Sequence, residues 1–338
     1  MKPKRSSRHP LLALALAALA PAALLAHPPD APSAAETLIL FDPAALETPE
    51  SIAIDRDGNI YISLALTGEI RKIAPDGTQS TLALLPIGPP LTFCGPFFNA
   101  VTGITLDRRE TALFVSVVSC DLASRGVWRV PLDGGAPELL ATLPLESIPN
   151  GIAWRRGVLY VADSALGVIW RVPEEGGTAE VWLEDPLLFG GTSPTMPLPG
   201  ANGLQIFRNV LYTSNSTTGT IIAVPFAPHD EAGTPRIHAV LPPGTGCDDF
   251  AIDVRGSIYC TTDPTNLLVR LNPDGTTEIL LTAVDGLDGP TAATFGRIGA
   301  DRFNLYITNA AFPFFPTTMF RPSLMRLHLG VPGAPPNW

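Results

Sequence analysis

A six-residue pattern that recurs six times along the chain constrains the fold more than any other feature. Its clearest copy is PNGIAW, at residues 149–154. The six copies span residues 49–54, 101–106, 149–154, 201–206, 247–252 and 290–295. They start 43 to 52 residues apart, a period typical of propellers and solenoids. The fourth and sixth positions are apolar in every copy, and the second position always carries a side-chain oxygen.

Three further strand-like stretches follow each of the first five copies, and two follow the last. After residues 149–154 they are residues 158–162, 168–172 and 179–183, with turns between them. Pairs of an acidic residue and glycine, such as Asp133-Gly134, mark the hairpin turns. Four antiparallel strands in each of six units predict an all-β fold, a six-bladed β-propeller.

The last unit contains only three such stretches, and an additional strand, Thr37–Phe41, precedes the first copy. We therefore predict that this N-terminal strand completes the last blade and closes the ring, which removes an open sheet edge. The alternative is an open β-sandwich of two sheets. A sandwich explains neither the six similar units nor the additional strand.

The first 26 residues have the pattern of a secretory signal peptide. A basic segment from Lys2 to Arg8 precedes an apolar run of Leu and Ala, and Ala26 is a candidate cleavage point. The alternative is a membrane anchor, but the run is short for a span and contains Pro21. We expect residues 27–36 to be a spacer, residues 37–330 the propeller and residues 331–338 a loose tail. The protein would then be periplasmic or secreted.

Composition limits the possible partners. The formal net charge is −10, and only 16% of the residues are charged. Nucleic-acid binding needs a basic face, so the acidic excess argues against it and against an anionic membrane surface. We expect a monomer that acts on a small molecule.

The second position of the six copies is the main candidate for function. First strands line the central channel of a propeller, so residues at one register converge at one of its mouths. These residues, called the mouth ring below, are Glu50, Thr102, Asn150, Asn202, Asp248 and Thr291. We expect them to lie just before the first strand of each blade.

The mouth ring has the donor chemistry of a hard cation site. Ca²⁺ binds carboxylate and amide oxygens, and Glu50, Asn150, Asn202 and Asp248 supply both kinds. The ring contains neither Cys nor His, which disfavours zinc and copper, although another divalent cation is possible. The alternative is that Asn-Gly pairs here are ordinary turn formers.

The four cysteines have three possible pairings. Cys247 lies beside the mouth ring, and Cys260 ends the second strand of the same blade. Cys94 and Cys120 hold similar places in blade two. We therefore predict the disulfides Cys94–Cys120 and Cys247–Cys260, with four buried thiols as the alternative.

We expect other residues to surround the same mouth. Four polar residues end second strands and are either turn formers or pocket walls: Asp163, Asn215, Asp263 and Asn309. Insertions at residues 86–100, 186–200 and 312–316 are expected at the mouth too. They carry phenylalanines that would make an apolar wall, namely Phe93, Phe97, Phe98, Phe312, Phe314 and Phe315.

The chain resembles the SMP-30/gluconolactonase/LRE-like family of six-bladed propellers over residues 37–330. The motifs that carry the resemblance are Pro49-Glu50, Pro149-Asn150-Gly151, Ala201-Asn202-Gly203, Cys247-Asp248-Asp249 and the strand at residues 159–163. The resemblance implies a calcium-dependent lactonase or esterase. It makes Glu50, Asn150, Asn202 and Asp248 the metal ligands, and Asp248 the catalytic base or nucleophile.

The chain also departs from the family pattern. It has Thr102 where family enzymes often place a substrate-binding Asn or Arg, and Asp249 where Gly usually follows the ligand Asp. We expect Thr102, Asp249, Thr291 and Asn309 to bind the substrate, whose identity these departures leave open.

Two functions of different kinds follow from the sequence. The first is an exported Ca²⁺-dependent hydrolase of a lactone or related ester. The second is a non-enzymatic propeller that binds a ligand or protein and uses the ion only to hold its blades together. A condensing propeller similar to strictosidine synthase, with a channel acid and no metal, is a third possibility.

Overall fold

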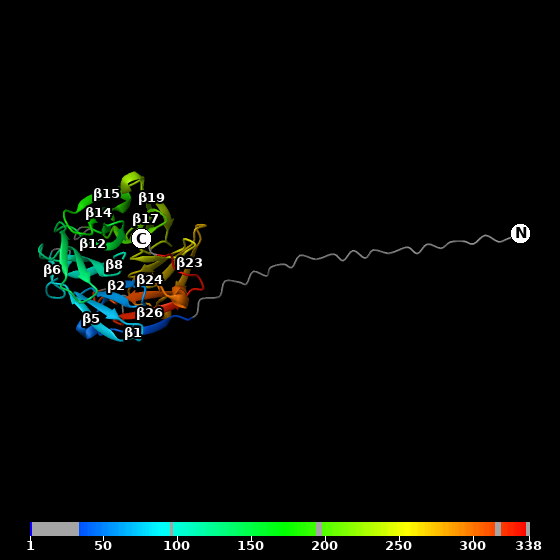
Figure 1. Cartoon of the computed structure of the whole chain (residues 1–338), viewed down its shortest axis with the longest axis horizontal. Coiled ribbons are helices and arrows are strands. Elements are labelled where there is room, and N and C mark those ends of the chain that lie inside the picture. Colours follow the sequence, from blue (N-terminus) through cyan, green and yellow to red (C-terminus); the bar gives the residue numbers. More distant parts are fainter. Residues whose placement is uncertain (2–33, 95–96, 194–197, 315–318, 336–338) are drawn as a thin grey trace. The chain divides into compact units, whose positions relative to one another are not determined.

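Six four-stranded antiparallel sheets are arranged as the blades of a propeller in the computed structural model (Figure 1). The structure describes residues 1, 34–94, 97–193, 198–314 and 319–335. The expected signal peptide and most of the spacer lie outside these residues, as does Phe315. In each blade the strand that starts with the repeated pattern lies nearest the centre, as Figure 1 shows for β2, β8, β12 and β24.

The first three blades each use four consecutive strands. Blade one contains β2 (Pro49–Ile54), β3 (Ile60–Leu64), β4 (Glu69–Ile73) and β5 (Gln79–Leu84). Blade two contains β8 (Ala100–Leu106), β9 (Ala112–Val118), β10 (Gly126–Pro131) and β11 (Glu138–Thr142). Blade three contains β12 (Pro149–Arg155), β13 (Val158–Asp163), β14 (Val168–Pro173) and β15 (Glu180–Glu184).

The remaining blades include the closure of the ring. Blade four contains β16 (Ala201–Phe207), β17 (Val210–Asn215), β18 (Thr220–Pro225) and β19 (Arg236–Val240). Blade five contains β20 (Phe250–Ile252), β21 (Ile258–Thr262), β22 (Leu267–Leu271) and β23 (Thr277–Leu281). Blade six contains β24 (Pro290–Phe295), β25 (Asn304–Asn309), β26 (Ser323–His328) and β1 (Glu36–Leu40). Because β1 pairs antiparallel with β26, the predicted closure by the N-terminal strand is confirmed.

In the part of the chain that the structure describes, helical structure is limited to short 3-10 turns. These are η1 (Pro43–Ala45), η2 (Pro186–Leu188), η3 (Pro228–Asp230), η4 (Ala283–Asp285) and η5 (Gly299–Phe303). A two-stranded hairpin of β6 (Phe93–Cys94) and β7 (Phe97–Phe98) lies in the insertion before blade two. No helix among the described residues is long and apolar enough to cross a membrane.

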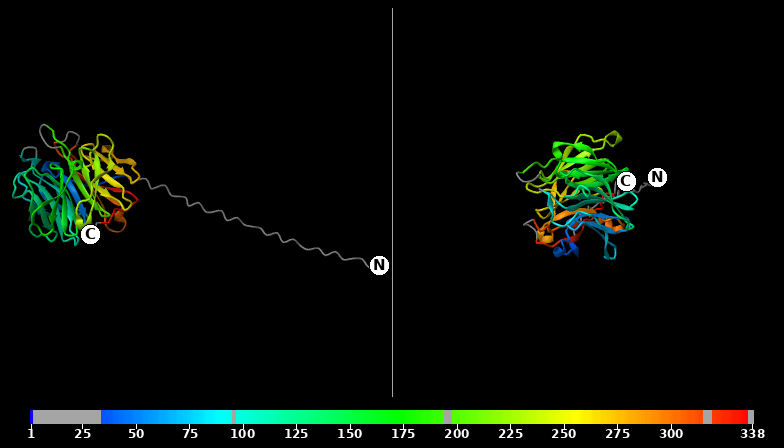
Figure 2. Two further views of the ribbon diagram at one scale, coloured as in Figure 1. Left: turned by 90° about the horizontal axis from the view of Figure 1, so that it is seen from above. Right: turned by 90° about the vertical axis from the view of Figure 1, so that its left-hand side faces the viewer.

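Apolar side chains fill the spaces between neighbouring blades. One cluster joins blades two and three and contains Phe114, Leu140, Trp154 and Trp170, each less than 9% exposed. Apolar side chains along each strand form such clusters, because both faces of a blade pack against the neighbouring blades. The strands run between two faces of the propeller, so every blade presents loops at each face (Figure 2).

Part of the expected loose tail is held against blade five. The Val254 N–H donates to Pro332 O over 3.1 Å, and the Ala334 N–H donates to Ile252 O over 2.9 Å. Val331 is buried. Residues 331–334 are therefore bound to the propeller, because the Pro332 carbonyl and the Ala334 amide form backbone hydrogen bonds with blade five. The composition of this segment did not predict the contact.

Candidate metal centre at the propeller mouth

The mouth ring lies at irregularities in the innermost strands. In five blades the register of β2, β8, β12, β16 or β24 against its neighbour shifts across the ring position. In blade five, β20 starts two residues after Asp248. A bulge turns one side chain out of the alternating pattern and points it in a new direction. Thus five ring residues lie within the first strand and not just before it, as the sequence had indicated.

Neighbouring innermost strands approach closely at this level. A Cβ atom added to Gly151 would lie only 2.4 Å from Asn202 O, so the glycine of the Asn-Gly pair is needed for blade-to-blade contact. The Gly203 N–H donates to Asp248 O over 2.9 Å in the same way. The Asn-Gly motifs are therefore more than turn formers, because they bring ring positions of adjacent blades together.

A row of hydroxyl groups on the second strands stabilises this arrangement. These hydroxyls were not among the residues predicted from the sequence. Ser214 Oγ accepts the Gly203 N–H over 2.8 Å and donates to Asp248 O over 2.8 Å. Equivalent second-strand hydroxyls bridge blades one and two, five and six, and six and one: Ser63, Thr261 and Thr308. The available signal was a Ser or Thr at one register of the second strand in five of the six units. Each bridge holds the backbone of a ring residue in place.

Asn202 and Asp248 are joined directly at the mouth. Asn202 donates from Nδ2 to Asp248 Oδ1 over 2.7 Å and to Ser216 Oγ over 3.0 Å. Asn202 Oδ1 is buried and has no hydrogen-bond partner among the described residues. A buried amide oxygen without a partner is costly, unless a cation or water fills the place facing it.

Glu50 and Asn150 complete the expected ligand set. Glu50 is only 8% exposed, and no hydrogen bond to its carboxylate occurs among the described residues. Asn150 makes one long contact, from Nδ2 to Ser164 Oγ at 3.5 Å. Two carboxylates and two amides that make few bonds to the protein have the donor chemistry of a calcium site. Within the described ranges, no three Asp, Glu, His or Cys side chains are grouped closely enough to hold a metal, so the amides would be essential.

Electrostatic repulsion is concentrated at this mouth. Burial, together with the charges of Asp249 and Asp263, raises the pKa of Glu50 to about 8. Burial and the charge of Glu50 also raise the pKa of Asp248. Burial raises the pKa of Asp249 to about 7. Burial and the charge of Asp288 raise the pKa of Asp263 to about 7 as well. Buried carboxylates that repel one another are stabilised by a cation between them.

Asp263 differs from the equivalent residues of other blades. Asp163, Asn215 and Asn309 are fully buried and hydrogen-bonded to the loops around them; Asp163, for example, accepts from Ile148 N, Ala165 N and Trp170 Nε1. Asp263 Oδ1 is buried without a hydrogen-bond partner in the described part of the chain. The three saturated residues are turn formers, whereas Asp263 adds a carboxylate to the mouth.

Two ring threonines and Asn309 use their hydrogen-bonding groups within the fold. Thr102 Oγ1 donates to Pro149 O over 2.8 Å, and Thr291 Oγ1 lies 3.1 Å from Pro49 O. Asn309 accepts from Asp288 N and donates to Ser323 Oγ. These contacts join blades or support loops. Asp249, expected with them to bind substrate, is partly exposed beside Asp248, and its carboxylate accepts a hydrogen bond from Phe250 N.

The phenylalanine-bearing insertions come together as expected. Phe98 packs against Phe312 and Phe314 with ring centroids 6.5 and 5.3 Å apart, and Phe93 packs against Phe98. Phe312 is buried with Leu66 and Ala100, while Phe93 and Phe314 are 59% and 40% exposed. The side chain of Phe97 lies outside the described residues. Insertions from blades two and six therefore form one apolar wall.

Both predicted disulfides are confirmed. Cys94 pairs with Cys120, and Cys247 pairs with Cys260. The second bond joins the residue before Asp248 to the second strand of blade five. It therefore restrains the backbone of one expected metal ligand.

Comparisons with known proteins support the family resemblance. The model of the SMP-30/gluconolactonase/LRE-like region matches residues 196–311, which include Asn202 and Asp248. No curated protein sequence matches the chain.

Solved structures share the fold at low sequence identity. A luciferin-regenerating enzyme is 16% identical with a TM-score of 0.62, over 90% of this chain and 98% of its own. Regucalcin from Agrobacterium tumefaciens, described as calcium-binding, is 15% identical with a TM-score of 0.62, over 88% of this chain and 95% of its own. A gluconolactonase from Xanthomonas campestris, XC5397, is 17% identical with a TM-score of 0.57, over 91% of this chain and 99% of its own. The family model thus confirms the resemblance to the SMP-30/gluconolactonase/LRE-like family over residues 196–311, and the solved structures share the propeller fold.

Proposed function

We propose that the protein is a hydrolase of lactones or related esters that holds a divalent cation, calcium, at the propeller mouth. The observation that carries this proposal is the pair formed by Asn202 and Asp248, in which Asn202 Oδ1 is buried and has no hydrogen-bond partner within the described ranges. The fold relatives support the reaction class, since they include a gluconolactonase and a calcium-binding regucalcin. Glu50, Asn150, Asn202 and Asp248 would hold the ion.

The ion, Asp248 and Asn202 would have separate roles in the hydrolysis. A bound calcium ion supplies a positive charge that polarises a carbonyl group and stabilises negative charge on its oxygen. Asp248 orients a water molecule and accepts its proton as the water oxygen bonds to the carbonyl carbon. When the ring C–O bond breaks, that proton passes to the leaving oxygen, and a hydroxy acid results. Asn202 holds Asp248 in place through the 2.7 Å hydrogen bond.

The surroundings of the mouth favour an apolar substrate. The wall of Phe93, Phe98, Phe312 and Phe314 lies on loops of blades two and six. Aromatic side chains near a few polar groups are typical of small-molecule sites. We therefore expect lactones with an alkyl or aryl substituent to be better substrates than sugar lactones.

We also propose that the protein acts outside the cytoplasm. Two disulfides persist in oxidising compartments such as the periplasm or the extracellular space. The signal-like first 26 residues agree with export. Expression with and without residues 1–26, followed by fractionation, tests this.

A panel of alkyl-substituted, aryl and sugar lactones tests the activity. We expect hydrolysis that EGTA abolishes, that CaCl₂ restores and that Asp248→Asn lowers by at least about 100-fold. Asp274→Asn, in an exposed turn of the same blade, is the matched control and should leave the rate unchanged. Activity that survives both chelation and Asp248→Asn would contradict the proposal. Calcium-dependent stability without turnover of any lactone would favour the ligand-binding propeller with a structural ion.

A further inference from the structure

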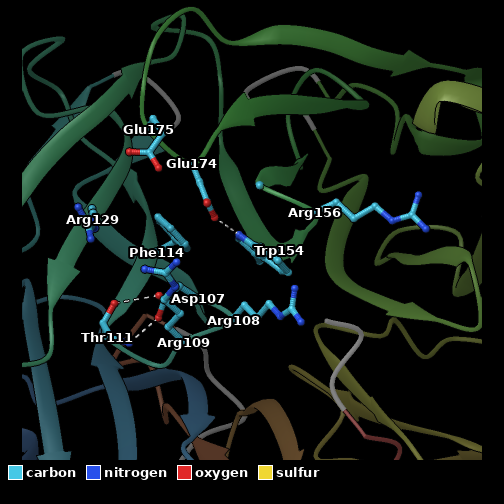
Figure 3. A pocket seen from close by; sticks show the side chains of 11 residues that line it. Asp107, Arg108, Arg109, Thr111, Phe114, Arg129, Trp154, Arg156, Glu174 and Glu175 are labelled. Carbon is cyan, nitrogen blue, oxygen red and sulfur yellow. Dashed lines mark hydrogen bonds between the residues drawn. The ribbon is translucent and has the colours of Figure 1, made fainter.

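A pocket lies between blades two and three at the face opposite the mouth. It has a volume of about 570 Å³ and is lined by the β8–β9, β12–β13 and β14–β15 turns together with Phe114, Arg129 and Trp154. Figure 3 shows these side chains around one hollow. Ligand pockets have volumes of about 300–1,000 Å³, so the space suits a small organic molecule. We call this space the arginine pocket.

Arg129 lacks the ion pair that its equivalents in three other blades make. Arginine lies at this third-strand position in four blades, as Arg129, Arg171, Arg270 and Arg326, and Lys72 lies there in blade one. Arg171, Arg270 and Arg326 each pair with a glutamate, for example Arg326 with Glu36 at 2.7 Å and Arg171 with Glu180 at 3.0 Å. Glu138 lies opposite Arg129 in the same register. Arg129 nevertheless has no ion pair among the described residues, and it lines the arginine pocket instead.

Three acids near this pocket already have partners within the fold, whereas Glu175 on its lining makes no ion pair among the described residues. Asp107 accepts hydrogen bonds from Thr111 N and Oγ1, as Figure 3 shows. Glu110 is paired with Arg56 and Arg297, at 3.0 and 2.8 Å. Glu174 accepts the Nε1–H of Trp154.

Three positive charges on the lining therefore lack a carboxylate partner. Arg108 and Arg109 make no ion pair within the described ranges, and both are exposed on the β8–β9 turn. With Arg129 they give the pocket an excess of guanidinium groups, in a chain of net charge −10. Guanidinium groups bind carboxylates through paired hydrogen bonds.

The apolar part of the lining is aromatic. Trp154 is 8% exposed, and Phe114 lies opposite Arg129 in the β9–β10 pairing. A flat ring in the pocket can pack on these side chains. Glu174 and Glu175 on the facing hairpin would repel a dianion more than a monoanion, which disfavours a phosphate monoester.

We propose that the arginine pocket is a binding site for an aromatic monocarboxylate. The carboxylate pairs with Arg129, assisted by Arg108 and Arg109, and the ring packs against Trp154. The site is independent of the mouth and of any ion bound there.

Calorimetric titration of the full chain with 2-naphthoate tests this proposal. We expect saturable binding at one site per chain, and no comparable binding of 2-naphthalenemethanol, which has the ring without the charge. Arg129→Gln should weaken binding by at least about tenfold, because a charge-assisted contact is lost. Arg171→Gln, at the equivalent position of blade three, is the matched control and should leave the affinity unchanged.

Further outcomes separate this site from others. Binding of 2-naphthoate should be the same in CaCl₂, in EGTA and in Asp248→Asn, whatever happens to hydrolysis. Melting curves of Arg129→Gln and Arg129→Lys establish that both variants fold. Three results would overturn the proposal: no saturable binding, equal effects of Arg129→Gln and Arg171→Gln, or tighter binding of 2-naphthyl phosphate than of 2-naphthoate.

Discussion

Asn202 donates a hydrogen bond to Asp248 across the boundary between blades four and five, while its own amide oxygen is buried and accepts none from the described part of the chain. Asn202 lies at the start of β16, and Asp248 lies just before β20; these are the innermost strands of blades four and five. The pair therefore lies where two repeated units meet at the mouth. The unsatisfied oxygen and the neighbouring carboxylates are a local cost in the folded protein. A cation at the mouth removes both costs at once, and the predictions below follow from that.

Calcium should stabilise the protein through Asn202. In the wild-type chain we expect the melting temperature to rise by several degrees between EGTA and CaCl₂, because the ion binds only the folded state. Asn202→Ala should abolish most of this increase, since it removes one neutral ligand. Asn272→Ala, in an exposed turn of blade five, is the control and should retain the full increase. Equal calcium-induced increases in the two variants would argue against Asn202 as a ligand.

Stability without calcium should fall as the pH rises from 5 to 8.5. The pKa values of Glu50, Asp249 and Asp263 are raised in the fold to about 8, 7 and 7, above ordinary carboxyl values of about 4. A raised folded pKa means that the folded state holds the proton more tightly. The stabilisation that comes from this tighter proton binding is complete below the pKa of the unfolded state. It is lost as the pH rises through the pKa of the folded state.

Melting curves at several pH values test this dependence. In EGTA the melting temperature should decrease across that window, and the difference between CaCl₂ and EGTA should grow. Glu50→Gln should flatten the EGTA profile. A melting temperature in EGTA that is constant or increases between pH 5 and 8.5 would contradict the electrostatic account of the mouth.

The hydroxyl bridge at Ser214 should contribute to stability, whereas its equivalent in blade two should not. Ser214→Ala leaves the Gly203 N–H and Asp248 O with one partner fewer, at a cost of about 1–2 kcal/mol. Ser116 Oγ is buried without a partner among the described residues, so Ser116→Ala removes an unsatisfied group. Denaturant titration should find Ser214→Ala clearly the less stable variant. If the two lose equal stability, the inter-blade bridges do not have the role assigned to them.

The Cys247–Cys260 disulfide should matter more for calcium binding than Cys94–Cys120. Each bond closes a short loop, of 13 and 26 residues. Loops of this size stabilise a fold by about 3 kcal/mol. Replacing either pair by alanine should lower the melting temperature, but only the 247/260 variant changes the restraint on Asp248. Calcium titration should therefore detect weaker binding in that variant alone.

The sequence predicted the propeller because its strongest signal, the repeat, reports the fold directly. Each unit must bury two faces against its neighbours, so apolar positions recur at one period from Ile52 to Phe295. Closure by the N-terminal strand followed from counting strands. The docking of Val331–Ala334 did not, because backbone hydrogen bonds of a Pro/Gly-rich segment leave no periodic pattern.

The candidate site could be predicted only in part. The register of Glu50, Asn150, Asn202 and Asp248 was visible because a polar residue recurred where packing needs none. The inter-blade hydrogen bonds of Thr102 and Thr291 could not be predicted, since a hydroxyl that bridges two blades and one that faces a substrate look alike in a sequence. The unusual surroundings of Asp263 and Arg129 could not be predicted for a different reason. Each resembles the equivalent residues of other blades and differs from them only in the partners that the fold provides.

A crystal structure of the protein grown in CaCl₂, with anomalous difference density for the cation, tests the central claim most directly. We predict one peak at the propeller mouth, with side-chain oxygens of Glu50, Asn150, Asn202 and Asp248 at about 2.3–2.6 Å from it. No peak at the mouth, or a peak bound by other residues, would contradict the proposed site and the hydrolysis that depends on it.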